Sequence, residues 1–257
     1  MDLGIKGRTA IVAGSTSGLG LAVARALAEE GVIVAFCGRR GELAHQYAAQ
    51  YSGSIGIEVD LQQKDSAKRL VEAAVDGLGP IDIVVLNSGG PTPGTASGLT
   101  IDAVDSAIQT LLVRQIELVS AVLPTMRERG WGRVVGVGSS GIQQPLPGLA
   151  LSNIARAGLA GYLKTLSGEV AGDGVTVNMV MPGRIATDRV ASLDQMKAER
   201  EGAEVSAVEE HSRSSIPAGR YGTPEEFGAV AAFLCSAQAS YVTGEQVRCD
   251  GGLVQSH

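Results

Sequence analysis

Short apolar segments alternate with longer helical patterns along almost the whole chain, and this alternation limits the possible folds more than any other feature. Nearly continuous apolar character is typical of parallel strands that helices cover on both faces. Segments of this kind occupy residues 9–13, 32–36, 55–59, 81–86, 133–137, 175–180 and 246–249. Helical patterns lie between them at residues 19–30, 41–51, 63–77, 101–129, 149–171 and 224–236. We therefore predict an α/β fold with a seven-stranded parallel, doubly wound sheet flanked by helices.

The chain length favours a single domain over residues 1–257, because 257 residues with 44% hydrophobic content suffice for one large core. Residues 184–221 interrupt the alternation, since they are polar and charged, with short helices predicted at 188–201 and 204–212. Ligands of open α/β sheets bind beyond the carboxyl ends of the strands, and this segment follows the sixth strand. We predict that it forms a substrate lid; a solvated surface loop is the alternative.

Three glycines with the spacing G-x-x-x-G-x-G follow the first predicted strand and precede a helix rich in Ala and Leu. Gly14 allows the sharp turn after the strand, Gly18 lets the backbone approach a pyrophosphate, and Gly20 lets the helix pack close to the sheet. The helix N-terminus adds free N–H groups and a positive dipole end. This pattern favours a Rossmann-type dinucleotide site over a structural turn, with contacts expected from Gly14, Ser15, Thr16, Ser17, Gly18 and Leu19.

The end of the second predicted strand indicates which dinucleotide is bound. An NAD site usually has an acidic residue there, which bonds the ribose 2′-hydroxyl. This chain has Gly38-Arg39-Arg40 instead, and the two arginines can pair with a 2′-phosphate through charge-assisted bonds. Ser15 can add a hydroxyl to the same phosphate. We therefore predict NADP(H) in preference to NAD(H); the alternative is that both arginines are solvated turn residues.

Composition and charge exclude several other classes of protein. The formal net charge is −6 and no Lys/Arg cluster is present, so we expect no nucleic-acid partner. The N-terminus lacks a secretory signal pattern, and no apolar run is expected to span a membrane. The three cysteines, Cys37, Cys235 and Cys249, are far apart and fit neither a disulfide framework nor a metal site. A soluble, reducing, cytoplasmic setting without a bound metal is the expectation.

Taken together, these motifs resemble the short-chain dehydrogenase/reductase family, of the 3-oxoacyl-acyl-carrier-protein reductase kind. Asn87-Ser88-Gly89-Gly90 stands where the family has Asn-Asn-Ala-Gly, a segment that lines the cofactor. The tail from Gly219 to Gly252 is similar to the family's C-terminal signature. The resemblance implies that further cofactor contacts come from Asp60 and Leu61 at the adenine ring and from Pro182, Gly183, Ile185 and Thr187 near the nicotinamide.

The catalytic positions depart from the family pattern of Asn, Ser, Tyr and Lys. Ser139 fits the serine position. Ser152 stands at the tyrosine position and Arg156 at the lysine position, thirteen and seventeen residues after Ser139. Leu111 stands at the asparagine position. The resemblance thus implies Ser139, Ser152 and Arg156 as the catalytic group, but not the family's usual proton relay.

These substitutions change the acid–base chemistry. The tyrosine pKa near 10 needs a modest shift to act at neutral pH, whereas a serine hydroxyl needs a far larger one. Arg156 can hold the nicotinamide ribose, but with a pKa above about 12 it is a poor proton relay. Together with Ser139 and Ser152 it can form an oxyanion-type clamp on a carbonyl. Tyr162, His211 and Tyr221 are other sources of an acid, although each fits a core or surface position at least as well.

Two function classes remain open. The first is an NADP(H)-dependent oxidoreductase that acts on a small carbonyl or alcohol substrate through a non-standard active site. The second is a catalytically impaired cofactor-binding protein, such as a sensor or an inactive subunit. Lyase chemistry of the haloalcohol dehalogenase kind is disfavoured, because those relatives keep the tyrosine and lose the glycine loop. The resemblance further implies a homo-tetramer or homo-dimer, formed through helices 101–129 and 149–171 and the C-terminal strand.

Overall fold

The computed structural model describes residues 2–255, which form one sheet of seven parallel strands in the order β3-β2-β1-β4-β5-β6-β7. This confirms the predicted fold class. The strands are β1 (Thr9–Val12), β2 (Ile33–Gly38), β3 (Ile55–Glu58), β4 (Ile83–Leu86), β5 (Gly132–Val137), β6 (Val175–Pro182) and β7 (Gln246–Cys249). The strand order reverses direction between β1 and β4, which is where ligands bind in sheets of this kind.

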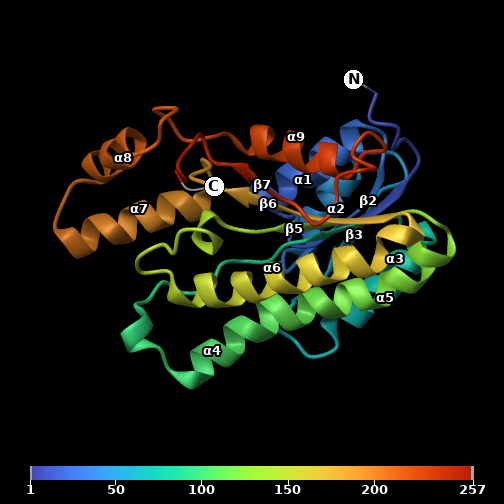
Figure 1. The fold of residues 1–257 in the computed structure, drawn as a ribbon, viewed down its shortest axis with the longest axis horizontal. Helices are drawn as coiled ribbons and strands as arrows, with labels where there is room; N and C mark the ends of the chain where they lie inside the picture. Colours follow the sequence, from blue (N-terminus) through green and yellow to red (C-terminus); the bar gives the residue numbers. More distant parts are fainter. Residues whose placement is uncertain (1, 256–257) are drawn as a thin grey trace.

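Helices cover both faces of the sheet (Figure 1). Those that follow β3, β4 and β5 lie on one face, and those that follow β1, β2 and the 184–221 segment lie on the other. Ile11 of β1 joins the first core, whereas Ala10 and Val12 join the second, as the twofold period of a strand requires. The helices are α1 (Gly18–Glu29), α2 (Gly41–Ala48), α3 (Ser66–Leu78), α4 (Ile101–Ile108), α5 (Arg114–Glu128), α6 (Ala150–Val170), α7 (Asp188–Glu201), α8 (Val205–Ser214) and α9 (Pro224–Leu234).

The single helix expected over residues 101–129 is divided by a π-helical turn at Gln109–Val113. Within this turn, the side-chain amide of Gln115 donates a hydrogen bond to the carbonyl oxygen of Thr110 at 3.0 Å. The apolar periodicity on either side of the turn continues across it, so the sequence pattern did not reveal the break. Leu111 lies in the turn, and π-helical turns are common at functional sites.

The helical segment Ile101–Glu128 is long and apolar enough to cross a membrane by length and composition, with a mean hydropathy of 1.3 in an 18-residue window. The expectation that no apolar run reaches such a length is therefore wrong. Within this segment, Leu118, Val119 and Val122 are buried in the core beneath the sheet. A core helix of a globular domain passes the same test of length and composition. The segment thus gives no support for a membrane span.

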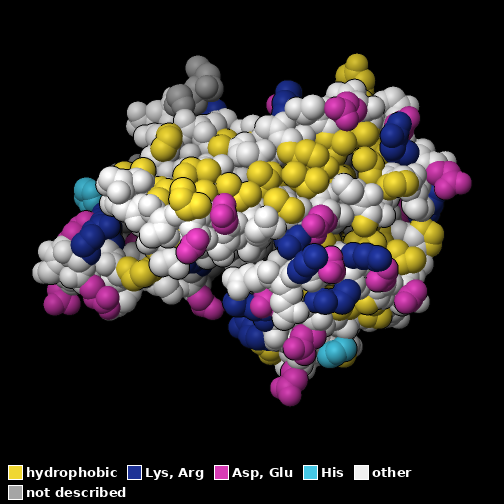
Figure 2. All heavy atoms as spheres, turned by 90° about the horizontal axis from the view of Figure 1, so that it is seen from below, with side chains coloured by type: hydrophobic (Ala, Val, Ile, Leu, Met, Phe, Trp, Pro, Cys, Tyr) yellow, Lys and Arg dark blue, Asp and Glu magenta, His cyan; other side chains and the backbone are white. Residues whose placement is uncertain are grey.

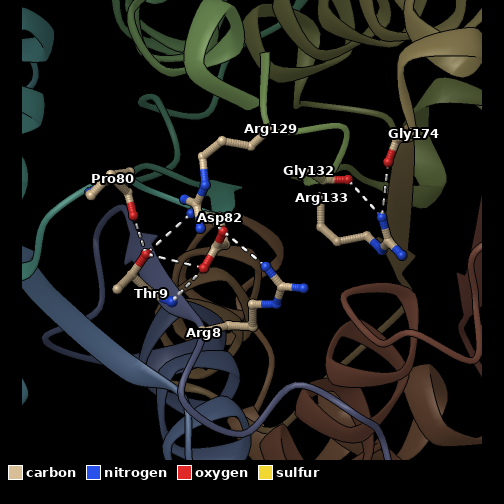
Figure 3. A network of polar contacts seen from close by, with 8 residues as sticks. All are labelled: Arg8, Thr9, Pro80, Asp82, Arg129, Gly132, Arg133 and Gly174. Carbon is tan, nitrogen blue, oxygen red and sulfur yellow. Dashed lines mark hydrogen bonds and ion pairs between the residues drawn. The ribbon is translucent and has the colours of Figure 1, made fainter. Parts of the chain in front are cut away.

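A polar network joins the amino ends of β1 and β4 (Figure 3). The buried Asp82 carboxylate, directly before β4, pairs with Arg8 Nη1 at 3.3 Å and with Arg129 Nη1 at 3.0 Å. It also accepts a hydrogen bond from the backbone N–H of Thr9 at 3.2 Å. Because this edge lies opposite the carboxyl ends of the strands, where ligands bind, we assign the network a structural role.

The buried guanidinium of Arg133 extends the network to β5. It donates hydrogen bonds to the carbonyl oxygens of Ser236 at 3.0 Å and Gly174 at 3.4 Å. The Trp131 ring lies between two cations, with the guanidinium carbon of Arg8 3.9 Å and that of Arg133 4.3 Å from the ring centroid. Charges at this edge are therefore compensated by carboxylate, carbonyl and aromatic partners.

We predict that D82N destabilises the fold, because it removes the one negative charge that Arg8 and Arg129 share in the network drawn in Figure 3. The expected loss is about 2 kcal/mol in the free energy of unfolding, measured by urea denaturation. D173N is the matched control, since Asp173 pairs with Arg127 on the surface, and its loss should stay below about 1 kcal/mol. Equal losses for the two variants would show that the buried network adds nothing.

Candidate functional site

The glycine loop between β1 and α1 is held in close contact with the end of β4. The Asn87 side-chain amide donates to the carbonyl oxygens of Ala13 at 3.1 Å and of Gly14 at 3.3 Å. A Cβ atom on Gly20 would lie 2.3 Å from the Gly14 carbonyl oxygen, so only glycine fits there. Gly14 and Gly18 have φ of +61° and +54°, which favours glycine at both positions. Gly14 and Gly20 thus have the turn and close-packing roles that their spacing predicted, and the role of Gly18 at a pyrophosphate stays a prediction.

The N-terminus of α1 is arranged to receive an anion. Its N-cap residue, Ser17, makes no side-chain hydrogen bond to the first turn of the helix, so the N–H groups of that turn have no side-chain cap. Leu19, in the same turn, is half-buried. The Thr187 methyl group lies 3.8 Å from the position of a Cβ on Gly18, so the segment after β6 begins beside the loop. Uncapped N–H groups and the helix dipole favour a phosphate at this point.

The structure corrects the expected role of the Ser15 hydroxyl. Ser15 is fully buried, and its Oγ accepts a hydrogen bond from the backbone N–H of Cys37 at 2.8 Å. The hydroxyl therefore joins the end of β1 to the end of β2 and does not point to a ligand. Arg40 is also occupied, because its Nη2 donates to the Thr16 carbonyl at 2.9 Å and approaches Thr16 Oγ1 at 3.3 Å.

Arg39, in contrast, is exposed and lines a groove beyond the ends of β2 and β3. Asp60 lies in the same groove, and Leu61 beside it is buried. Arg69 and Gln63, which sequence reasoning missed, also line the groove, with Arg69 Nη2 3.0 Å from Gln63 Oε1. An arginine on an exposed helix face carries no sequence signal that separates it from a solvated one. Among residues 2–255, Arg39 pairs with no carboxylate.

The remaining predicted cofactor residues follow two strands. Ser88 is half-buried and Gly89 is exposed just after β4, and the space around Gly89 is open on the side where a Cβ would lie. Pro182 ends β6, and the backbone N–H of Gly183 donates to the Cys249 carbonyl at 3.0 Å. Ile185 is buried and forms an isolated bridge with Gly222. All these residues stand at the carboxyl edge of the sheet, as predicted from the strand positions.

Ser139 and Arg156 lie near the carboxyl end of β5, and Ser152 lies one helical turn before Arg156 on α6. Ser139 follows the strand, and its Oγ accepts a hydrogen bond from the backbone N–H of Gly141 at 3.1 Å. Ser152 and Arg156 are four residues apart on α6 and so share one face of that helix. Arg156 is buried, and its Nη1 donates to the Val137 carbonyl at 2.5 Å. This bond ties α6 to the last residue of β5.

The environment of Arg156 changes its acid–base properties. Burial is the main cause that lowers its pKa from the ordinary arginine value to about 10, and the charge of Arg189 lowers it further. The expectation of a pKa above about 12 is therefore wrong, because it ignored the cost of removing the cation from water. At neutral pH the guanidinium is still protonated, and it remains a cationic hydrogen-bond donor.

Leu111, at the family's asparagine position, lies in apolar surroundings. Its side chain is buried in a small apolar cluster with Ala107, Leu151 and Ala155. It thus packs α6 against the π-helical turn and offers no polar group to a water molecule. The side-chain oxygen of buried Gln115 has no hydrogen-bond partner among the described residues, which sequence reasoning did not single out.

The three other candidate proton donors are Tyr162, His211 and Tyr221, and they lie in other parts of the structure. The Tyr221 hydroxyl donates to Asp194 Oδ2 at 2.8 Å, and burial raises its pKa. His211 is exposed on α8. Tyr162 packs against the core beneath the sheet, and burial raises its pKa as well. A raised pKa makes both tyrosines weaker acids than usual, so none of the three replaces the missing tyrosine in this structure.

A buried carboxylate fixes the segment of residues 184–221. Asp194 of α7 is fully buried and pairs with Arg184 at the start of the segment and with Tyr221 at its end. The two ends also lie side by side, since the N–H of Gly222 donates to the Arg184 carbonyl at 2.9 Å and the N–H of Ala186 donates to the Gly222 carbonyl at 2.8 Å. The segment therefore leaves and rejoins the fold at one place, beside the carboxyl edge of the sheet.

Comparison with known proteins agrees with this arrangement. Residues 13–254 match the sequence model of the family described as Enoyl-(Acyl carrier protein) reductase. The chain is 31% identical to 3-oxoacyl-acyl-carrier-protein reductase of Aquifex aeolicus, covering 98% of this chain and 100% of that protein. It is 32% identical to dehydrogenase/reductase SDR family member 4 of Sus scrofa, covering 96% of this chain and 88% of that protein. The chain belongs to the short-chain dehydrogenase/reductase family.

Solved structures give the same result for the fold. The L-sorbose reductase of Gluconobacter frateurii, solved with NADPH and L-sorbose, superposes with a TM-score of 0.92 at 28% identity, covering all of both chains. An actinorhodin polyketide ketoreductase solved with NADPH superposes with a TM-score of 0.90 at 30% identity, covering 96% of this chain and 97% of that one. These proteins are reductases, and each was solved with NADPH.

We predict that D194N loosens α7 without unfolding the sheet, because Arg184 and Tyr221 then lose a fully buried anion. A loss of about 3 kcal/mol in local stability corresponds to roughly 100-fold faster amide hydrogen exchange in α7. E210Q on α8 is the control, since Glu210 pairs with Arg213 on the surface. Exchange that accelerates equally in both variants, or not at all in D194N, contradicts the anchoring role.

Proposed function

We propose that this protein is an NADP(H)-dependent oxidoreductase that interconverts a carbonyl compound and an alcohol through a non-standard active site. The observation that carries the proposal is the pairing of an uncapped α1 N-terminus with an exposed Arg39 that has no carboxylate partner within residues 2–255. The first suits a pyrophosphate and the second suits a 2′-phosphate. Family membership and the NADPH named with two structural neighbours support the same cofactor.

The residues present fit this cofactor along the whole carboxyl edge. The groove with Arg39 and Asp60 receives the adenosine end, the glycine loop receives the pyrophosphate, and Asn87 and Thr187 flank the path to the nicotinamide. A bound nicotinamide supplies or accepts the hydride, which is chemistry that the protein itself does not provide.

Ser139, Ser152 and Arg156 then act on the substrate oxygen. As hydride adds to a carbonyl carbon, negative charge develops on the oxygen. The Arg156 cation and the two hydroxyls stabilise that charge by hydrogen bonding, as donors in an oxyanion hole do. Because the guanidinium pKa is about 10, Arg156 stays charged at neutral pH, and the alkoxide takes its proton from water. The geometry thus replaces a tyrosine acid by electrostatic stabilisation.

We also propose that residues 184–221 are the substrate lid. The segment begins at the glycine loop and places α7 over the turn after β4, where Arg189 Nη2 donates to the Pro91 carbonyl at 2.6 Å. A helix in this position limits the access of bulk solvent to the hydride-transfer region.

Self-association is a further part of the proposal. Figure 2, seen from below the view of Figure 1, shows an apolar band across the face that holds α4, α5 and α6. Ile101 of α4 and Ile154 of α6 are exposed. Burial of such side chains favours a homo-dimer, or a homo-tetramer if a second surface also pairs. Light scattering of the purified chain measures this state.

We predict that R39A removes the preference for NADPH over NADH. Loss of a charge-assisted bond to the 2′-phosphate corresponds to about 10- to 100-fold weaker NADPH binding, with NADH binding unchanged. Cofactor fluorescence titration measures both dissociation constants. R40A is the control: Arg40 holds the backbone of Thr16, so its loss should weaken both cofactors alike. An unchanged ratio in R39A overturns the NADP(H) assignment.

We predict that carbonyl reduction depends on a protonated Arg156. The turnover number should be constant from about pH 6 to 9 and fall as pH rises through about 10, where the guanidinium loses its proton. R156Q should lower it about 100-fold and abolish the alkaline limb. R156K should keep more activity, and R127Q on the surface of α5 should keep all of it.

The outcome of a substrate panel decides between the two function classes. Binding of NADPH without turnover of any ketone, aldehyde or alcohol would favour a catalytically impaired cofactor-binding protein. The triple variant S152Y/R156K/L111N then tests the pocket. Activity that is created by these changes from an inactive protein would show that the natural chain does not use the pocket as a reductase.

A further inference from the structure

Two arginines, Arg156 and Arg189, lie at the carboxyl ends of β5 and β4, and neither pairs with a carboxylate of residues 2–255. Arg156 comes from α6 and donates to the Val137 carbonyl. Arg189 comes from the first turn of α7 and donates through Nη2 to the Pro91 carbonyl. Each guanidinium therefore has a neutral carbonyl as its hydrogen-bond partner, and its positive charge is not compensated.

Arg189 differs in this respect from the other arginines of residues 184–221. Each of those pairs with a carboxylate: Arg184 with Asp194, Arg200 with Glu201, Arg213 with Glu209 and Glu210, and Arg220 with Glu226. Its neighbour Asp188 is exposed and forms no ion pair within residues 2–255. Arg189 is therefore the one arginine of residues 184–221 without a carboxylate partner in the described structure, and it lies two residues after Thr187, which contacts the cofactor loop.

The positive charges of Arg156 and Arg189 repel each other. Burial lowers the pKa of Arg189. Burial is also the main cause of the lowered pKa of Arg156, and the positive charge of Arg189 lowers that pKa further. Partly buried like charges cost free energy unless an anion lies between or beside them. An anionic ligand would relieve both the desolvation and the repulsion, which an uncharged ligand cannot do.

The position of Arg189 indicates that such an anionic ligand would be part of the substrate. Its guanidinium lies against the backbone of Gly90, where the site of a Cβ would be 3.1 Å from Nε. Two residues earlier, Thr187 lies beside Gly18 of the glycine loop. Arg189 thus lies at the turn after β4, two residues after the contact of Thr187 with the glycine loop.

We propose that Arg189 binds a carboxylate on the substrate, so that the natural substrates are oxo acids or the corresponding hydroxy acids. This inference rests on the proposed function and deepens it. With Nη2 bonded to Pro91, the Nη1 donors remain for the carboxylate, and Arg156 remains for the carbonyl oxygen. The two ends of an oxo acid then bind to two different arginines, and this fixes the orientation of the carbonyl.

The test compares acetoacetate with its neutral ester, ethyl acetoacetate, as substrates with NADPH. The wild-type kcat/KM should favour the acid, and R189Q should lower this acid-to-ester ratio about 10- to 100-fold, as expected for loss of a charged hydrogen-bond donor. R189K should restore part of it. R127Q, on the surface of α5 and outside the proposed lid, is the control and should leave the ratio unchanged.

A binding measurement separates this inference from the proposed function. Calorimetry follows acetoacetate binding to the NADP⁺ complex, which cannot reduce it. Acetoacetate that binds the wild type and not R189Q supports the inference even where no turnover is found. An acid-to-ester ratio and acetoacetate binding that R189Q leaves unchanged overturn it. Weaker NADPH binding in R189Q with an unchanged ratio also overturns it, since the anion is then the cofactor pyrophosphate.

Discussion

The parallel pairing of all seven strands is the constraint on which the rest of the molecule depends. It places every carboxyl end at one edge of the sheet and every amino end at the other. Polar groups at the amino edge find partners within the protein, as Asp82 does with Arg8 and Arg129. At the carboxyl edge, the α1 N-terminus, Arg39 and Arg189 lack carboxylate partners among residues 2–255, so the same sheet has one edge that stabilises it and one that can bind ligands.

The catalytic positions show how strongly a site depends on its surroundings. Replacing a lysine by Arg156 keeps the positive charge, but burial and the nearby Arg189 lower its pKa to about 10. Replacing an asparagine by Leu111 converts a polar position into a packing contact with Ala155. Under the proposed function these changes act together, because a site without a proton relay would gain from fixed positive charge near the developing alkoxide. Electrostatic stabilisation and acid catalysis are alternative ways to lower the same barrier.

Sequence reasoning predicted the sheet, its flanking helices and the glycine loop, because buried parallel strands and Gly14, Gly18 and Gly20 leave strong local signals. It missed what depends on three-dimensional contact. The π-helical turn around Leu111 does not disturb the apolar period, and the Ser15 hydroxyl faces Cys37 only once β1 and β2 pair. That Arg189 has no carboxylate partner within residues 2–255 depends on which carboxylates the neighbouring arginines contact, and the sequence does not show those contacts. The lid and the roles of the site residues stay predictions that the experiments above address.

The two ends of the segment 184–221 lie side by side, and this arrangement affects how easily the segment can be replaced by another. Its ends are joined by backbone hydrogen bonds at Gly222, and Asp194 connects the interior of the segment to both. A loop whose ends already lie together can be exchanged for another with little entropic cost to the rest of the fold. Under the proposed function, grafting a different segment after Thr187 is therefore a route to new substrate selectivity that keeps the cofactor contacts expected from Ile185 and Thr187.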